Sequence, residues 1–234
     1  MVTSRKKLLH IIVPVYNEAV NFPILYEQIA KNIKTKHILV VVYDFDEDTT
    51  LPIVRKYQQI DKNLILYKNT RGRGALNAIL SGFDYVKDGP LLVTMADLSD
   101  DLSIVDTMYK KYVEGADLVC GSRYMKGGKQ LGGPLLKRSL SYIAGMSLYW
   151  FRSIPTHDVT NNFKLYDKAL LNTINIESKG GFEIAMEITV KAFKSNKAIT
   201  EVPSIWTDRT DGDSNFKLWR WLPSYIKWYL YALF

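Results

Sequence analysis

Short apolar runs alternate with helical patterns along the first half of the chain, and few folds accommodate such an alternation. Runs typical of buried strands cover residues 8–13, 37–43, 64–67, 91–95 and 117–121. Helical patterns between them cover residues 18–33, 50–59, 74–86 and 103–113. The alternation predicts an α/β fold whose mainly parallel sheet carries helices on both faces. Ligands of such sheets bind outside the carboxyl ends of the strands.

The second half continues the pattern after a glycine-rich stretch. Residues 126–134 contain four glycines and two lysines and are expected to form a mobile loop. Beyond them we expect a helix over 135–150, a strand over 162–166, a helix over 182–195 and a strand over 198–202. These elements complete the predicted core.

The apolar run at 90–95 ends in a dense acidic tip that contains Asp97, Ser99, Asp100 and Asp101. Carboxylates at one strand end repel one another unless a cation lies between them. A divalent metal with oxygen ligands meets that need, and Mg²⁺ normally brings substrate phosphates with it. The tip therefore favours nucleotide or nucleotide-sugar chemistry. The alternative is an acidic helix start, because Ser99, Asp100 and Asp101 also suit an N-cap.

Charge and composition narrow the classes of partner. The net charge of +7 favours an anionic partner: nucleic acid, anionic lipid or a phosphorylated substrate. No zinc-ligand spacing or helix-turn-helix pattern supports nucleic acid. The single cysteine excludes an internal disulfide and suits a reducing compartment. We find neither a signal-peptide pattern nor an 18-residue apolar run and expect a cytoplasmic protein.

Seven segments, in one order, resemble family 2 glycosyltransferases of the GT-A fold, in particular the dolichyl-phosphate or polyprenyl-phosphate sugar synthases. They read Val-Pro-Val-Tyr-Asn-Glu at 13–18, Val-Tyr-Asp-Phe-Asp-Glu-Asp-Thr-Thr at 42–50, Gly-Arg-Gly-Ala at 72–75, Met-Ala-Asp-Leu-Ser at 95–99, Gly-Ser-Arg-Tyr at 121–124, Asp-Val-Thr-Asn-Asn-Phe-Lys-Leu-Tyr at 158–166, and Arg-x-x-Gly-x-Ser at 209–214. The resemblance implies a Rossmann-like GT-A domain over 1–205. An acceptor-binding segment and an interfacial aromatic tail follow over 206–234.

The resemblance also implies the reaction: inverting transfer of a sugar from a GDP- or UDP-sugar to a polyprenyl phosphate, assisted by Mg²⁺ or Mn²⁺. Polymer-forming relatives carry a Glu-Asp base motif after the metal motif, and this sequence has no such pair, which favours a phosphate acceptor. Two alternatives stay open. One is transfer to a glycan hydroxyl, and the other is a non-catalytic nucleotide-sugar-binding protein.

The implied donor site spans several motifs. Its residues are Pro14, Tyr16, Glu18, Asp44, Arg71, Arg73, Asp97, Arg123 and Arg138. Asp44 is expected to accept hydrogen bonds from the base or ribose, and the arginines to meet the diphosphate. Tyr43 replaces the first of the family's paired aspartates, which leaves the base open. Without the resemblance, the segment with Arg71 and Arg73 is equally consistent with a solvated turn.

The implied metal ligands are Asp97 and Ser99. The family's first metal-motif aspartate is replaced by Met95, whose thioether is a poor partner for a hard cation. Three alternatives follow: weak metal binding, recruitment of Asp100 or Asp101, or reliance on Asp97 and the diphosphate.

The implied catalytic residues are Asp97, Arg123 and Asp158. Those implied for acceptor binding are Arg138, Asp158, Arg209 and Ser214. A turn or cap role is the alternative for Asp158. Glu183 and Glu187 share one helical face, where a solvated position is expected for at least one.

The tail from 216 to 234 is dense in aromatic residues that interleave with Lys217, Arg220 and Lys227. Trp and Tyr favour the membrane–water interface, and cations favour anionic headgroups. We therefore expect peripheral association with a membrane surface. The alternative is a helix that packs its aromatics on the core or on a partner.

Overall fold

The computed structural model describes residues 5–208 and 218–234. Its strands are β1 Leu9–Val15, β2 His37–Tyr43, β3 Leu64–Lys68, β4 Pro90–Val93, β5 Leu118–Ser122, β6 Lys129–Leu131, β7 Lys164–Asp167, β8 Ile199–Pro203 and β9 Ile205–Thr207. Its helices are α1 Asn21–Asn32, α2 Thr50–Gln58, α3 Ala75–Tyr85, the 3₁₀ helix η1 Leu102–Ile104, α4 Val105–Val113, α5 Leu135–Arg152, α6 Lys168–Thr173, α7 Ile184–Lys194 and α8 Leu218–Leu233.

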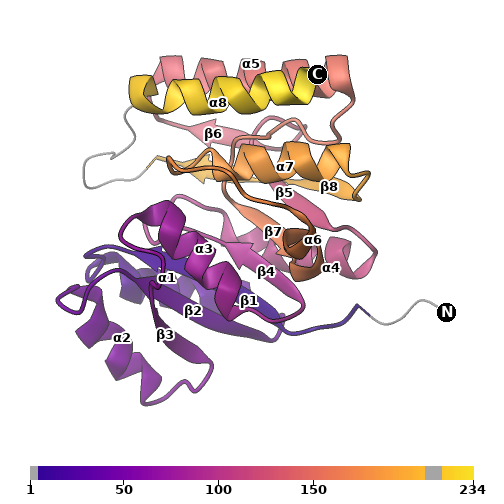
Figure 1. The fold of residues 1–234 in the computed structure, drawn as a ribbon. Coiled ribbons are helices and arrows are strands. Elements are labelled where there is room, and N and C mark those ends of the chain that lie inside the picture. The colour runs from indigo at the N-terminus through magenta and orange to yellow at the C-terminus, as the bar shows by residue number, and fades with distance from the viewer. Residues whose placement is uncertain (1–4, 209–217) are drawn as a thin grey trace.

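A seven-stranded sheet forms the centre of the molecule, in the order β3-β2-β1-β4-β7-β5-β8 (Figure 1). Neighbouring strands run parallel except at β7, which is antiparallel to both β4 and β5. The predicted mainly parallel sheet with flanking helices is confirmed.

Alternate side chains of the strands build two cores. Leu9, Ile11 and Val13 of β1 pack on one face with residues of α1, α2 and α4. Ile12 points to the other face, where α3, α6 and α7 contribute the apolar partners. Both faces of the central strands are therefore covered, which explains why their sequences read as continuous apolar runs.

The sheet has a topological switch point between β1 and β4. From β1 the chain moves to β2 and β3 on one side, whereas β4 lies on the other side of β1. Connections after these two strands diverge, so a crevice opens at their carboxyl ends, where α/β proteins bind ligands. The segments after β1 and β4 carry Pro14 to Glu18 and the acidic tip.

Helices α5 and α8 form a third layer, beyond α7 (Figure 1). Leu148 of α5, Val190 of α7 and Trp228 of α8 belong to one buried cluster, and Trp228 is only 1% exposed. One face of the aromatic tail therefore packs on the protein, as the alternative for the tail expected.

A second, two-stranded sheet pairs β6 with β9 in parallel. The stretch 126–134, expected to be a mobile loop, thus contains a strand. Its partner lies far along the chain, and such a distant pairing leaves no local sequence pattern. Strand β9 spans the boundary that we predicted at residue 205.

In the part of the chain that the structure describes, no helix has both the length and the apolar character needed to cross a membrane.

The packing of α8 predicts a specific loss of stability. Trp228→Ala removes a buried ring and should lower the free energy of unfolding by about 3–5 kcal/mol, measured by urea denaturation. Leu230→Ala, on the same helix but 47% exposed, is the control and should change it by less than about 1 kcal/mol. Equal effects of the two changes would contradict the burial of this helix face.

Candidate active site

A cavity of about 1100 Å³ opens at the carboxyl ends of β1, β2, β4 and β5 and is closed on its far side by α5 and α8. Nine of the predicted site residues line it: Pro14, Tyr16, Glu18, Asp44, Arg73, Asp97, Ser99, Arg123 and Arg138. Arg71 and Asp158 are not in its lining. Arg209 and Ser214 lie outside the described residues.

The turn after β1 is clamped to the segment after β2. Asp48, 1% exposed, accepts a hydrogen bond from the backbone N–H of Asn17 at 3.1 Å. The hydroxyl of Thr50 accepts another from the N–H of Glu18 at 2.8 Å. Asn17 has a φ of +56°, a conformation that asparagine tolerates better than most residues. The clamp leaves Tyr16 exposed at the cavity and places Glu18 before α1 rather than inside it.

Asp44 fixes the start of α3. One carboxylate oxygen accepts from the side-chain amide of Asn69 at 2.7 Å, and the other from the N–H of Gly74 at 2.8 Å. Gly74 has a φ of +118°, which strongly favours glycine. The contact of Asp44 with a base or ribose stays a prediction.

Of the two arginines before α3, only Arg73 reaches the cavity. The guanidinium of Arg71 forms a bidentate ion pair with Asp84 on α3, with Nε–Oδ2 at 2.6 Å. A carboxylate of α3 therefore holds the Arg71 side chain outside the cavity lining, and its expected contact with the diphosphate stays a prediction. The guanidinium of Arg73 lies over the ring of Phe45, 5.2 Å from its centre.

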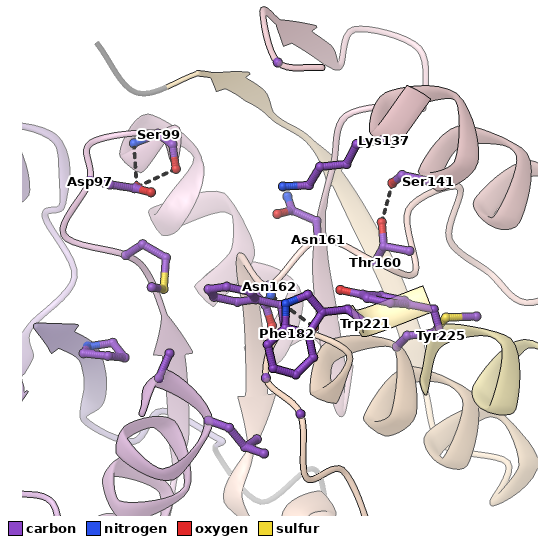
Figure 2. A pocket seen from close by; sticks show the side chains of 18 of the residues that line it. Asp97, Ser99, Lys137, Ser141, Thr160, Asn161, Asn162, Phe182, Trp221 and Tyr225 are labelled. Atoms are coloured by element: carbon purple, nitrogen blue, oxygen red, sulfur yellow. Dashed lines mark hydrogen bonds between the residues drawn. The ribbon is translucent and has the colours of Figure 1, made fainter. Parts of the chain in front are cut away.

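The acidic tip after β4 is folded back on itself. Asp97 Oδ1 accepts from the N–H of Ser99 at 3.2 Å and from its hydroxyl at 2.7 Å (Figure 2). Asp100 Oδ2 accepts from the hydroxyl of Thr94 at 2.9 Å and from the N–H of Met95 at 3.2 Å. Burial and the nearby charge of Asp97 raise the pKa of Asp100 to about 7.

These donors fit a hard divalent cation. Asp97, Ser99 and Asp100 offer carboxylate and hydroxyl oxygens to one cavity, and Mg²⁺ and Mn²⁺ take oxygen ligands. Within residues 5–208 and 218–234, no group of three or more Asp, Glu, His or Cys side chains could hold a metal ion, so a bound cation would need further oxygens from substrate or water. Asp101 faces another way: it caps η1 by accepting from Ser103.

A buried ion pair lies behind the cavity. Asp158 is fully buried, and both its oxygens accept from the guanidinium of Arg123, at 2.7 and 2.9 Å. Burial alone raises the pKa of Asp158, but the charge and hydrogen bonds of Arg123 outweigh it and hold that pKa below its usual range. Asp158 thus holds Arg123 in a buried ion pair outside the cavity lining, and its catalytic and acceptor-binding roles stay predictions.

The same arginine anchors α5. Its Nη2 donates to the hydroxyls of Ser141 at 3.1 Å and Thr160 at 3.0 Å, and these two hydroxyls also bond to each other (Figure 2). Arg123 still lines the cavity, but its guanidinium already donates hydrogen bonds to Asp158, Ser141 and Thr160. The first turn of α5 carries Lys137 and Arg138 along the cavity wall.

Two buried glutamates shape the loop between α6 and α7. Glu183 accepts from the N–H groups of Gly180 and Gly181, at 2.8 and 2.7 Å. Glu187 accepts from the N–H groups of Glu177 and Ser178, at 2.6 and 2.8 Å. Both glutamates are fully buried, so the expected solvated position is wrong for each.

The loop between α6 and α7 also packs closely against α8. A Cβ on Gly180 would lie 2.4 Å from the ring of Trp221, so a side chain there has no room. This loop lines the cavity through Lys179 to Phe182, and Asn162 donates to the carbonyl of Phe182 (Figure 2). Sequence reasoning missed the loop, and the paired glycines were its one visible signal.

A sequence profile of the family described as "Glycosyl transferase family 2" matches residues 10–174. The chain belongs to glycosyltransferase family 2. It is therefore a glycosyltransferase, and the resemblance identified from its motifs is confirmed.

Two curated relatives are similar to most of this chain. A polyprenol monophosphomannose synthase from Mycolicibacterium smegmatis is 29% identical over 87% of this chain and 79% of its own length. A dolichol-phosphate mannosyltransferase from Pyrococcus furiosus is 27% identical over 88% of this chain and 58% of its own length.

Solved structures support the GT-A fold. Glucosyl-3-phosphoglycerate synthase from Mycobacterium tuberculosis with uridine diphosphate gives a TM-score of 0.69 at 15% identity, covering 99% of this chain and 82% of that one. A second structure of that synthase, with Mn²⁺, uridine diphosphate and glucosyl-3-phosphoglycerate, gives 0.66 at 14% identity, covering 99% and 81%.

The buried pair of this family 2 enzyme predicts a large effect on stability. Asp158→Asn leaves Arg123 buried without its counter-charge and should lower the free energy of unfolding at pH 7 by about 3–5 kcal/mol, measured by denaturant titration. Asp88→Asn is the control because Asp88 pairs with Lys7 on the surface, and it should leave the midpoint nearly unchanged.

The difference in the free energy of unfolding between wild type and Asp158→Asn should depend on pH in one direction. The pKa of Asp158 is lower in the folded protein than its ordinary value of 3.8. The stability it contributes is therefore present above pH 3.8 and is lost as the pH falls below it. The gap between wild type and Asp158→Asn should stay constant from neutral pH to mildly acidic pH and shrink below 3.8. A gap that shrinks at neutral pH would contradict the assignment.

Proposed function

We propose that this glycosyltransferase moves a sugar from a GDP- or UDP-sugar to a polyprenyl phosphate at a membrane surface, with inversion at the sugar. One observation carries the proposal. A single cavity joins the acidic tip after β4 to a wall of cations and apolar side chains on α5 and α8. The names of the two curated relatives, both of which refer to polyprenol or dolichol phosphate, support it.

The donor occupies the sheet side of the cavity. Pro14, Tyr16 and Glu18 bind the nucleoside together with Asp44, and Arg73 with the N-terminus of α3 meets the diphosphate. The first-turn N–H groups of α3 and the guanidinium of Arg73 both favour anionic oxygens. Support comes from the position of all five side chains in the cavity lining.

Asp97 and Ser99 hold Mg²⁺ or Mn²⁺ in this proposal. The ion neutralises charge that develops on the leaving diphosphate. The oxygen donors at the end of β4 support this assignment, as does the Mn²⁺ in the similar Mycobacterium tuberculosis structure.

The acceptor phosphate lies against α5. A lipid phosphate is already an anion, so its attack needs positioning by cations and no general base, whereas a sugar hydroxyl needs a base. Lys137 and Arg138 line the cavity on the first turn of α5. The predicted partners Arg209 and Ser214 lie outside the described residues and stay part of the proposal.

The outer face of α5 and α8 is the proposed membrane-docking face. We define it by its exposed apolar side chains: Leu135, Leu136, Ile143, Trp150 and Phe151 on α5, Ile226 and Leu230 on α8, and Phe234 directly after α8. Ile143 and Ile226 also line the cavity. The cavity therefore opens beside this face, where a lipid phosphate can enter without leaving the bilayer surface. This arrangement supports peripheral association with a membrane, which we place on the cytoplasmic side as part of the proposal.

The reaction is tested by incubating the protein with membranes and radiolabelled GDP- and UDP-sugars. Label should enter lipid that organic solvent extracts. Asp97→Asn should reduce it by about 100-fold or more, because the ion loses its carboxylate ligand next to the leaving group. Asp101→Asn is the control, because Asp101 lies outside the cavity lining and its carboxylate accepts from Ser103 instead. Label in a polymer, or none with any donor, would overturn the proposed acceptor or the proposed activity.

Docking is tested by co-sedimentation with vesicles of phosphatidylcholine and phosphatidylserine. Phe151→Asp replaces a 79% exposed ring on the membrane-docking face and should weaken binding about tenfold or more, since burying such a ring contributes roughly 1.5–3 kcal/mol. Ile60→Asp is a matched control, because Ile60 is 80% exposed beyond α2, away from that face. Equal binding by the two variants would show that the face does not meet lipid.

A further inference from the structure

The metal site of this chain lacks one carboxylate where the resembling enzymes have it. Position 95 follows β4 and carries methionine. A thioether does not ligate Mg²⁺ well and ligates Mn²⁺ weakly, since both prefer oxygen. The proposed site would then rest on Asp97, a hydroxyl and the substrate. That is a sparse set of charges to hold a divalent ion beside a diphosphate.

A second carboxylate, that of Asp100, lies beside position 95 and lines the same cavity. The side chain of Asp100 turns back toward β4, and its Oδ2 accepts from the N–H of Met95 and from the hydroxyl of Thr94. The carboxylate therefore lies against the backbone of the residue that replaces the family's acid. It also lines the cavity that Asp97 lines.

Only one oxygen of Asp100 is engaged in this way. Among residues 5–208 and 218–234, no hydrogen bond to its Oδ1 is present, whereas Asp97 Oδ1 already accepts twice from Ser99. Two carboxylates that face one cavity repel each other, and a divalent cation between them turns that repulsion into shared attraction. A backbone that holds Asp100 in place reduces the entropy lost when the ion binds.

We infer that Asp100 supplies the second carboxylate to the divalent ion, in place of the aspartate that Met95 replaces. The inference rests on the proposed function in one respect, because it takes the ion to be the one that Asp97 binds. It assigns this chain a metal motif in which residues 97 and 100, three apart, provide the charged oxygens.

The neighbouring Asp101 provides the contrast that the inference needs. Its Oδ1 accepts from the N–H and the hydroxyl of Ser103, and its Oδ2 from the N–H of Ile205 at 3.4 Å. Asp101 is outside the cavity lining. Asp100 and Asp101 are adjacent in sequence. They differ in the direction of their side chains, so that Asp100 faces the cavity and Asp101 caps η1.

The test measures Mn²⁺ binding directly. MnCl₂ is titrated into the purified full chain with UDP, and separately with GDP, and free Mn²⁺ is followed by its electron paramagnetic resonance signal. Asp100→Asn should raise the Kd for Mn²⁺ by about tenfold or more, because it removes one ligand charge. Asp101→Asn should leave the Kd within about twofold of wild type.

A rescue variant separates ligation from folding. Met95→Asp combined with Asp100→Asn returns a carboxylate to the family's position and should restore most of the affinity that Asp100→Asn loses. Circular dichroism and thermal melting confirm that each variant is folded. An Asp100→Asn protein that is folded and binds Mn²⁺ like wild type would overturn the inference, as would a double variant with no recovery or a wild type that binds no Mn²⁺ with either nucleotide.

The same titration distinguishes this inference from the proposed function. If wild type and variants follow the expected order of Mn²⁺ affinity but no labelled lipid forms, the acceptor assignment fails and Asp100 remains a ligand. If labelled lipid forms and Asp100→Asn keeps wild-type Mn²⁺ affinity, the transfer stands and the role of Asp100 is refuted.

Discussion

The active site depends on the buried ion pair between Arg123 and Asp158, because that pair joins the sheet to the helical layer that closes the cavity. Asp158 accepts from Arg123 and from the N–H of Asn161, while the side-chain amide of Asn161 donates to the carbonyl of Gly121. Arg123 in turn reaches Ser141 on α5. Burying two charges carries a large desolvation penalty, so such a pair adds little stability over an apolar one. Its visible contribution here is a connection from the sheet to α5, through the hydrogen bond from Arg123 to Ser141.

The features of the fold and the site that could be predicted from the sequence are those that depend on contacts between residues close together in the chain. Alternating strands and helices predicted the sheet, because apolar periodicity is set within each element. The pairing of β6 with β9 joins residues 129–131 to 205–207 and left no local pattern. Arg71 and Arg73 were indistinguishable in sequence. In the structure Arg71 forms an ion pair with Asp84 of α3, whereas Arg73 lines the cavity. The fold was thus predictable. Which of two neighbouring charged side chains forms an ion pair and which lines the cavity was not.

Buried charges were the main source of wrong expectations at the site. Asp158 was expected to take part in catalysis and acceptor binding, with a turn or cap role as the alternative. At least one of Glu183 and Glu187 was expected on a solvated helix face, because isolated carboxylates are rarely buried. Each is instead held by donors: the guanidinium of Arg123 for Asp158, and backbone N–H groups for the two glutamates. Arg123 lies 35 residues from Asp158 in the chain, so no local pattern joins them, whereas the donors to the glutamates lie within ten residues. A carboxylate in a glycine-rich neighbourhood, such as Glu183 after Gly180 and Gly181, is the local pattern that indicates this arrangement.

Helix α8 has one packed face and one exposed face, so its packing on the protein is compatible with the proposed membrane contact. Trp228 and Ala232, four residues apart, are buried against α5 and α7, whereas Leu230 and Phe234, also four apart, are exposed. Residues four apart share a helix face, so the two pairs define an inner and an outer side of one helix. The inner side holds α8 to the protein, and the outer side is free to meet lipid. Because Ile226 also lines the cavity, a change in the depth at which α8 docks would alter the cavity mouth itself. In the proposed function, acceptor entry and membrane contact therefore both depend on α8, whereas the proposed donor site lies at the sheet.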